Sequence, residues 1–523
     1  MKRSTPQNRP SRSNASGSRP ARGASGGGRS ARGADGPQPM ALLAHVYAAL
    51  QEVLKLEGPA DSSLRRHFKA HAKLGRRDRG LIAETVFDVL RNRRLYGHWA
   101  QSLLGPLTHR LANLSLARRL DLPALAALGL QEHSEMLQGL VQSPTTGLPP
   151  ALRLSQPDWL YAGLQESLAR AMTPAQSVSA EIDPTPSETT VSDSAMSCAA
   201  AVDALGSALL EPASLDLRVN LLKSDLETVL KALAQEEIEA WPLPEVPTAI
   251  RVRGKPAIER MVAFDDGWFE VQDVGSQALV AFCGVKRGQT VVDFCAGAGG
   301  KTLAMAAQMR NRGQIFACDT SMARLTRMKP RLVRSGATNI QPFALESEGD
   351  ARLGRLAGRA DRVLVDAPCS GTGTLRRNPE IKWRLAESDI AELALKQGRI
   401  LAAAARLVKP GGMLIYATCS LLTAENDAVA QAFAQTHPGF EAAGVMRLLP
   451  GLPAHSGTTK GLTVIPDDQN GIPDHEHGIP AARSGFPDDQ DAGTPASAAA
   501  PAAAFTPGPQ GDGFFAARWI RKA

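Results

Sequence analysis

Short apolar runs alternate with helical segments across residues 286–450 of this 523-residue chain. We expect strands at residues 291–294, 314–318, 363–365 and 413–416, because each run is apolar and ends at turn or polar residues. Strands that alternate with helices in this way are typical of a doubly wound parallel sheet. The sequence therefore predicts a Rossmann-like α/β domain, in which ligands bind at the carboxyl ends of the strands.

Two cysteines follow two of these runs. Cys369 and Cys419 each lie a few residues past an apolar run, so we expect both thiols to face one site at the carboxyl edge of the sheet. Either cysteine alone would be interpreted as a small buried hydrophobe. That interpretation does not explain a pair of cysteines beside Asp366-Ala367-Pro368 and Ala417-Thr418.

A glycine-rich turn follows the first run. Its sequence is Cys295-Ala296-Gly297-Ala298-Gly299-Gly300-Lys301-Thr302. Glycines at such a turn let backbone amides approach a ligand and direct the positive end of the next helix at a carboxylate or phosphate. Gly-Lys-Thr also ends the phosphate-binding loop of nucleoside triphosphatases, but that motif requires a glycine where Cys295 stands. We therefore do not expect nucleoside triphosphate binding.

Asp319 ends the next expected strand, about twenty residues after the glycine turn. An acid at this place accepts hydrogen bonds from ribose hydroxyls. The turn and Asp319 together fit NAD and S-adenosylmethionine equally well. A glycine turn with a purely structural role is a further alternative.

The pair of thiols favours one chemistry. C5 of cytosine is a poor nucleophile until a thiolate adds at C6; C5 can then attack an electrophilic methyl group, and the adduct collapses by losing the C5 proton. One cysteine adds to the ring, and a second group assists release. A carboxylate such as Asp366 near the base would accept a hydrogen bond from the exocyclic amine and steady the protonated ring nitrogen.

Composition divides the rest of the chain. We expect a disordered basic tail at 1–39 and a helical domain at 40–150. A small α+β module should follow at 151–285, with a low-complexity insertion at 171–213. The α/β domain should span 286–523, with a disordered insertion at 452–511. The apolar segment 514–520 should complete the sheet. His475-Glu476-His477 lacks further ligands nearby, so we expect no metal site there or elsewhere.

The formal charge of +7 comes from the tail, because residues 1–39 hold eight Lys or Arg residues and one acid, Asp35. The tail could contact phosphate, or it could be a solvated arm without a specific role. Within 40–150 the basic residues form a cluster that we interpret as an RNA-contacting surface, in preference to an ordinary solvated face. The cluster consists of Arg65, Arg66, Lys69, Lys73, Arg76, Arg77, Arg79, Arg91, Arg93 and Arg94.

Neither an apolar run of about 18 residues nor a secretory signal occurs in the sequence. We therefore expect a cytoplasmic protein that does not span a membrane. The six cysteines lack C-x-x-C spacing, so we expect free thiols.

Four motifs occur in order: the glycine turn at 295–302, Asp366-Ala367-Pro368-Cys369-Ser370-Gly371-Thr372-Gly373, Arg377-Asn378-Pro379-Glu380 and Thr418-Cys419-Ser420. Together they resemble the Sun/RsmB-type family (NOP/NSUN superfamily) of RNA cytosine-C5 methyltransferases. Residues 74–79 are similar to that family's NusB-like helical domain. Residues 218–220 and 272–277 are similar to its pre-catalytic module. The resemblance covers most of residues 40–450 and the last strand.

The resemblance implies an enzyme that transfers a methyl group from S-adenosylmethionine to C5 of a cytosine in RNA, with ribosomal RNA as the favoured substrate. It implies that Cys419 is the nucleophile and that Cys369 assists product release, with residues 295–301 (Lys301 included), Asp319 and Asp366 at the cofactor and base. The residues alone do not rank the thiols. In DNA cytosine methyltransferases the cysteine of Pro-Cys attacks, which would make Cys369 the nucleophile.

Two positions depart from the family pattern. Ala298 stands where the family usually has proline. The acid expected near the adenine has three candidates, Glu346, Glu348 and Asp350, and we favour Glu346 from its strand position. A non-catalytic RNA-binding assembly factor and a DNA cytosine methyltransferase are the alternative functions, and we expect a monomer.

Overall fold

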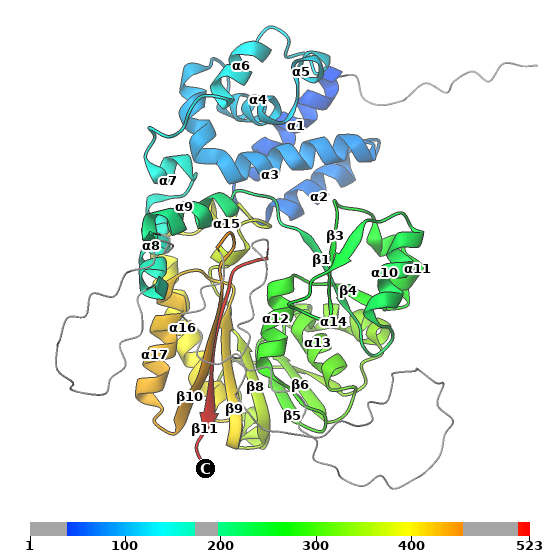
Figure 1. Cartoon of the computed structure of the whole chain (residues 1–523), viewed down its shortest axis with the longest axis vertical. Coiled ribbons are helices and arrows are strands. Elements are labelled where there is room, and N and C mark those ends of the chain that lie inside the picture. The colour runs from blue at the N-terminus through cyan, green and yellow to red at the C-terminus, as the bar shows by residue number, and fades with distance from the viewer. Residues whose placement is uncertain (1–38, 173–196, 453–510) are drawn as a thin grey trace, which may run out of the picture.

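The computed structural model describes residues 39–172, 197–452 and 511–523 (Figure 1). The basic tail up to residue 38 and most of both expected insertions, including His475-Glu476-His477, lie outside the described residues. Within the described ranges, every helix is too short or too polar to cross a membrane.

The N-terminal domain is entirely helical and lies at the top of Figure 1. Its elements are α1 (Pro39–Val53), α2 (Ala60–Ala70), α3 (Arg76–Trp99), a short 3-10 helix η1 (Ala100–Ser102), α4 (Leu107–Arg119), α5 (Leu122–Ala127), α6 (Ser134–Val141) and α7 (Pro150–Arg153). Apolar residues three and four apart line one face of each long helix. On α3, Ile82, Val86, Val89 and Leu90 are fully buried in this core.

A small antiparallel sheet follows, with strand order β2-β3-β1-β4. Its elements are β1 (Leu215–Val219), α10 (Leu226–Gln235), β2 (Ala240–Pro242), β3 (Ala249–Val252), η2 (Ile258–Arg260), α11 (Val262–Asp265) and β4 (Phe269–Val271). Leu217 lies opposite Ile250 across the β1–β3 pair, and both are completely buried with Val229 and Leu233 of α10. This is the α+β module that the sequence predicts.

The third part holds a seven-stranded sheet with strand order β10-β11-β9-β8-β5-β6-β7. Its strands are β5 (Thr290–Asp293), β6 (Gln314–Asp319), β7 (Ile340–Ala344), β8 (Ala360–Asp366), β9 (Val408–Thr418), β10 (Phe440–Leu448) and β11 (Phe514–Arg521). In this order, the five strands β9, β8, β5, β6 and β7 are parallel, each paired with the next. Val363, Leu364 and Val365 of β8 are at most 1% exposed, as expected for a strand covered on both faces. The predicted doubly wound α/β fold is confirmed.

Helices cover both faces of this sheet (Figure 1). They are α12 (Val274–Cys283), α13 (Gly300–Gln308), α14 (Met322–Ser335), η3 (Ala351–Leu356), η4 (Thr372–Thr374), α15 (Ile381–Arg384), α16 (Glu387–Ala405), η5 (Thr423–Glu425) and α17 (Asp427–Thr436). Leu279 of α12 and Met305 of α13 bury on one face, and Leu401 of α16 and Phe433 of α17 bury on the other.

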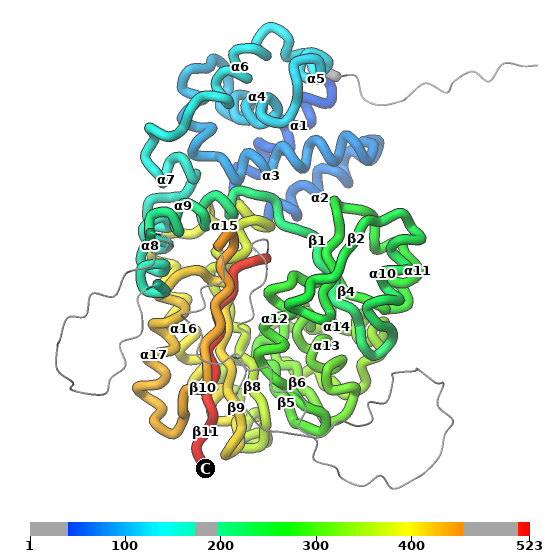
Figure 2. The backbone as a smooth tube through the Cα atoms, viewed as in Figure 1, coloured from blue at the N-terminus to red at the C-terminus, as the bar shows by residue number. Residues whose placement is uncertain are grey.

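The last strand enters the sheet between β9 and β10, antiparallel to both (Figure 2). Phe515 lies opposite Thr418, the residue before Cys419. The segment therefore does complete the sheet, but as an inner strand that supports the carboxyl end of β9.

Two helices lie before the small module, and one of them falls where the sequence analysis placed an insertion. α8 (Asp158–Met172) begins ahead of the expected low-complexity insertion, whereas α9 (Cys198–Ala208) falls inside it. Both pack against the α/β domain, because Leu164 and Leu205 share a core with Leu421 and Leu422. We expected no helix at α9 because its sequence is rich in alanine. The helix is stabilised by this buried face, which composition does not reveal.

Part of the basic cluster holds the helical domain to the α/β domain. The buried Arg91 donates to the carbonyl of Arg376 at 2.9 Å, and Arg93 lies over the ring of Trp383. Arg94 pairs with Asp158 at 2.7 Å. The expected RNA-contacting surface therefore loses these three members, while the rest of the cluster on α2 and the start of α3 is mostly exposed.

Candidate active site

The two thiols meet at the carboxyl edge of the sheet. Cys369 follows β8 and Cys419 follows β9, and these strands pair in parallel with Asp366 opposite Ala417. The Sγ atoms lie 3.3 Å apart. The hydrogen bond with Cys419, together with burial, raises the pKa of Cys369 well above the usual thiol value. Cys369 is therefore a thiol at neutral pH and can donate to the Cys419 sulfur.

A buried glutamate fixes the residue after each cysteine. Glu425 Oε2 accepts hydrogen bonds from the hydroxyls of Ser370 and Ser420, both at 2.5 Å, and Oε1 accepts from the Ser370 amide at 2.8 Å. Gln397 also donates to Oε1 at 3.0 Å. Glu425 is 0% exposed, so this carboxylate ties two loops together away from competing water. Sequence reasoning missed Glu425, because its only signal is an acid six residues after Cys419 in what reads as a polar loop.

The loop after Cys369 approaches Cys419 closely at a glycine. The Gly373 amide donates to the Cys419 carbonyl at 2.8 Å. A Cβ at Gly373 would lie 2.3 Å from the Gly513 carbonyl oxygen, closer than real Cβ atoms come. A glycine is therefore required for the two cysteine loops and the start of β11 to meet.

Lys301 and Asp366 form an ion pair beside the thiols. Lys301 Nζ on the first turn of α13 lies 2.7 Å from Asp366 Oδ2 at the end of β8. Burial lowers the pKa of Lys301, but the Asp366 carboxylate and the nearby Cys419 raise it further, so the net shift is upward. The ammonium is therefore charged. Among the described residues, Asp366 Oδ1 makes no hydrogen bond.

The glycine turn and Asp319 come together as expected. The Gly297 amide donates to Asp319 Oδ2 at 2.9 Å, and the Ser321 amide donates to Oδ1 at 2.7 Å. A carboxylate has about four lone-pair positions, so two of them remain for ligand hydroxyls. Gly297 has a φ of +57°, and a Cβ there would meet no atom within 4 Å. The space beside the turn is therefore open.

The small module supports the glycine turn from behind. Arg331 of α14 donates to the Ala298 carbonyl at 2.8 Å and pairs with Glu270 of β4 at 2.9 Å. Glu270 also pairs with Arg334 at 2.5 Å. Ala298, which departs from the family pattern, is thus held through its carbonyl oxygen and does not depend on a rigid side chain.

The structure bears on the choice among the three acids after β7. Asp350 pairs with Arg352 at 2.5 Å and also accepts from the Glu346 amide. Glu348 pairs with Arg399 at 3.2 Å. Within the described residues no hydrogen bond or ion pair engages the Glu346 carboxylate, which is exposed. Among the three candidates, the Glu346 carboxylate is thus the one without such a partner, and its contact with a ligand stays a prediction.

One buried acid beneath the turn has an unused oxygen. Asp293 Oδ2 accepts from Thr302 at 2.7 Å, whereas Oδ1 is buried and has no partner among the described residues. Burial raises the pKa of Asp293 to about 7, although the Thr302 hydrogen bond opposes the shift. Sequence reasoning missed this residue because it reads as the last position of an apolar strand.

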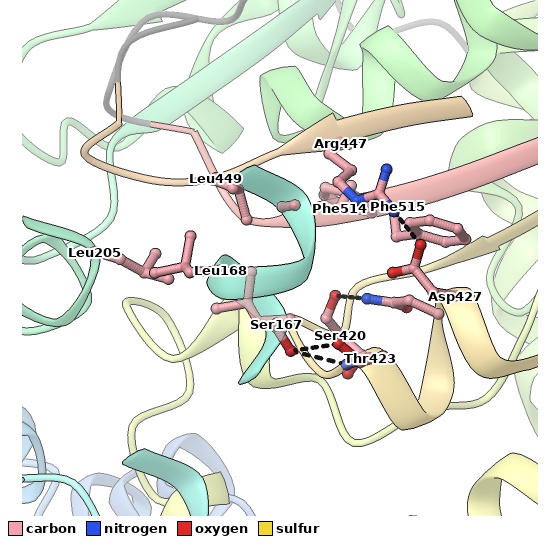
Figure 3. A pocket seen from close by; sticks show the side chains of 13 residues that line it. Ser167, Leu168, Leu205, Ser420, Thr423, Asp427, Arg447, Leu449, Phe514 and Phe515 are labelled. Atoms are coloured by element: carbon pink, nitrogen blue, oxygen red, sulfur yellow. Dashed lines mark hydrogen bonds and ion pairs between the residues drawn. The ribbon is translucent and has the colours of Figure 1, made fainter. Parts of the chain in front are cut away.

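A pocket opens behind the Ser420 turn, lined by residues of α8, α9, η5, α17, β10 and β11 (Figure 3). Ser167 of α8 accepts from the Thr423 amide at 2.9 Å, and Asn426 donates to the Ser420 carbonyl at 2.9 Å. Neither Cys369 nor Cys419 lines the pocket. It is part of the packing behind the site and is not the place where a base would reach the thiols.

Comparisons with known proteins agree with this fold and site. Residues 281–473 match the profile of the 16S rRNA methyltransferase RsmB/F family, and residues 199–259 match the RsmF/B-like ferredoxin-like domain. Over these residues the chain is similar to Sun/RsmB-type methyltransferases. The expected family resemblance is confirmed, and with it the assignment of the seven-stranded sheet as a methyltransferase domain.

Individual relatives cover this methyltransferase to different extents. A probable ribosomal RNA small subunit methyltransferase B of Synechocystis is 29% identical over 456 residues, or 80% of this chain and 95% of that protein. The ribosomal RNA small subunit methyltransferase B of Serratia proteamaculans is 38% identical over 224 residues, or 42% of this chain and 51% of that protein. The crystal structure of PH0851 shares the fold, with 22% identity and a TM-score of 0.61 over 92% of this chain and 98% of that one.

The residues of this methyltransferase fit S-adenosylmethionine, the methyl donor that the family implies. The open space beside Gly297 and the remaining lone pairs of Asp319 lie at the glycine turn. A ligand with ribose hydroxyls would satisfy the remaining lone pairs of Asp319.

Proposed function

We propose that this chain methylates C5 of a cytosine in ribosomal RNA through a covalent bond between Cys419 and C6 of the base. The carrying observation is the 3.3 Å separation of the Cys369 and Cys419 sulfur atoms at the ends of neighbouring strands. Two thiols at one site suit a reaction that both forms and breaks a bond to the base. The names of the relatives support ribosomal RNA as the substrate.

The residues divide the reaction between them. The Cys419 thiolate adds to C6 and makes C5 nucleophilic. Asp366 Oδ1 accepts from the exocyclic amine and so holds the base in register. S-adenosylmethionine, when bound, supplies the electrophilic methyl group.

Release restores the aromatic ring. A base takes the C5 proton, the electron pair of that C–H bond forms the C5–C6 double bond, and the Cys419–C6 bond breaks with its electron pair returning to Cys419 as a thiolate. Cys369 lies 3.3 Å from Cys419 and is placed to help move the proton that release requires. In this scheme residues 295–300 and Asp319 bind the donor, and Glu346 contacts its adenine.

A labelled-methyl transfer assay tests the reaction class. The purified chain is incubated with labelled S-adenosylmethionine and with RNA, DNA or protein from a deletion strain. Label in RNA that bisulfite sequencing places on cytosine supports the proposal. Label in DNA favours the DNA-type alternative, and RNA binding without transfer favours a non-catalytic assembly factor.

Bisulfite sequencing of total RNA from the deletion strain and its parent then locates the target. A cytosine in small-subunit ribosomal RNA that loses its methyl group only in the deletion strain is the expected result. A change confined to another RNA would contradict the ribosomal assignment while leaving the chemistry intact.

A further inference from the structure

Three histidines gather in the helical domain, which does not carry the thiols. His45 lies on α1, and His67 and His71 lie at the end of α2. The ring centroids of His71 are 4.6 Å from those of both His45 and His67, and His45 and His67 are 5.5 Å apart. One nitrogen from each ring can be chosen so that all three lie within 4.8 Å of one another.

The backbone places these rings together for two reasons. His67 and His71 are four residues apart, so they lie on the same side of α2 one turn apart. α1 and α2 are held side by side because Val46 and Leu64, one residue after His45 and three before His67, are buried in the same core. The cluster therefore rests on well-packed elements and not on a mobile loop.

One ring nitrogen of the cluster lacks a partner. His67 Nε2 is buried and makes no hydrogen bond to any described residue. A buried polar atom without a partner costs about 1–3 kcal/mol, so such atoms usually bind something. A neutral imidazole has a lone pair that can bind a metal ion.

We propose that His45, His67 and His71 bind a divalent transition-metal ion such as Zn²⁺, which fastens α1 to α2. Nitrogens bound to one tetrahedral Zn²⁺ at about 2.0–2.1 Å are about 3.4 Å apart, so the rings need to close by roughly 1 Å. His71 is exposed, so water completes the fourth position. The proposal departs from our expectation from the sequence, which weighed only His475-Glu476-His477 as a metal site.

In the sequence, His67 and His71 lie between the exposed basic residues Arg65 and Arg66 of α2 and Arg76 and Arg77 of α3. By fixing α2 on α1, the ion would hold these side chains in place on the surface that we expect to contact RNA. Its role is structural and does not depend on the proposed methyl transfer.

The test uses the untagged full-length chain after removal of bound metal with a chelator. Zn²⁺ is titrated in competition with a chromogenic chelator, and Co²⁺ absorption reports four-coordinate geometry. We expect one ion per chain. His71→Ala should weaken Zn²⁺ binding roughly tenfold or more and remove the rise in melting temperature that Zn²⁺ gives the parent chain. His133→Ala, an exposed histidine of the same domain, is the matched control and should change neither.

Two further variants keep the result decisive. His475→Ala with His477→Ala should retain the ion, whereas loss of binding in that double variant would place the metal outside the helical domain and overturn the proposal. His67→Gln should lose the ion while circular dichroism shows its helices intact. Equal affinity of the parent and His71→Ala chains would also overturn the proposal.

Discussion

The sulfur atoms of Cys369 and Cys419 lie 3.3 Å apart although 50 residues separate them in the chain. The parallel pairing of β8 with β9 brings them together, and the buried Glu425 holds the loop after each strand. Because the two thiols share one site, substituting each in turn separates their roles.

Cys419→Ala should abolish both methyl transfer and any covalent complex with RNA, because no thiolate remains to add to C6. Cys369→Ala should still add to the base and transfer the methyl group but stall before release. A protein–RNA adduct that survives denaturing gel electrophoresis should then accumulate. The reverse pattern, with the adduct in Cys419→Ala, would show that the roles are exchanged as in the DNA enzymes.

Asp319→Ala should weaken S-adenosylmethionine binding by about 1.5–3 kcal/mol, the usual contribution of hydrogen bonds to a charged acceptor. The carboxylate also fixes the Gly297 amide, so part of the loss comes from a looser turn. Calorimetry measures the affinity, and Asp203→Ala, which removes a partner of Arg153 far from the turn, is the control. Unchanged affinity in Asp319→Ala would refute the assignment.

Glu425→Gln should lower the turnover number more than it changes S-adenosylmethionine affinity, because the glutamate positions the cysteine loops and does not contact the glycine turn. In this variant an NH₂ group replaces one carboxylate oxygen. A hydrogen-bond donor then faces the hydroxyl and amide groups that donated to the carboxylate. The expected loss of stability is about 1–3 kcal/mol. Steady-state kinetics and thermal melts check this, with the exposed Glu441→Gln on β10 as the control. A turnover number equal to that of the parent chain would rule out a positioning role.

Asp293 should make the protein less stable as pH rises from about 4 to about 7. Its folded-state pKa is raised to about 7 by burial, whereas an unfolded aspartate ionises near pH 4. Between these values the folded state binds the extra proton, so the free energy of unfolding falls with pH and levels off above 7. Asp293→Asn should remove this slope in denaturant melts of the ligand-free protein. If Asp293→Asn shows the same pH dependence of stability as the parent chain, another group causes it.

Deleting residues 456–508 should leave a folded chain, since β11 lies beyond them and long surface insertions add little closure entropy. Soluble expression and the parent melting temperature are the expected results. Aggregation of the shortened chain would mean that the insertion packs against the sheet.

The sequence by itself determined the α/β sheet and the edge at which its site lies. Apolar runs such as residues 363–365 can satisfy their buried backbone only in a covered parallel strand, and the residues that follow must lie at its carboxyl end. Cys369, Cys419, Asp366 and Asp319 were therefore predictable from local pattern. The glycine turn was predictable for the same reason, because its conformation depends on its own residues.

The tertiary structure decided the properties that depend on contacts between residues distant in the chain. Glu425 and Asp293 look like ordinary polar residues until the fold buries them, and burial gives each its strong hydrogen bonds or its shifted pKa. The helix at Cys198–Ala208 and the role of Arg91 likewise follow from surfaces contributed by other domains. His45 and His71 meet only because two helices pack, and the energy of such contacts depends on distances in space that a linear sequence does not specify.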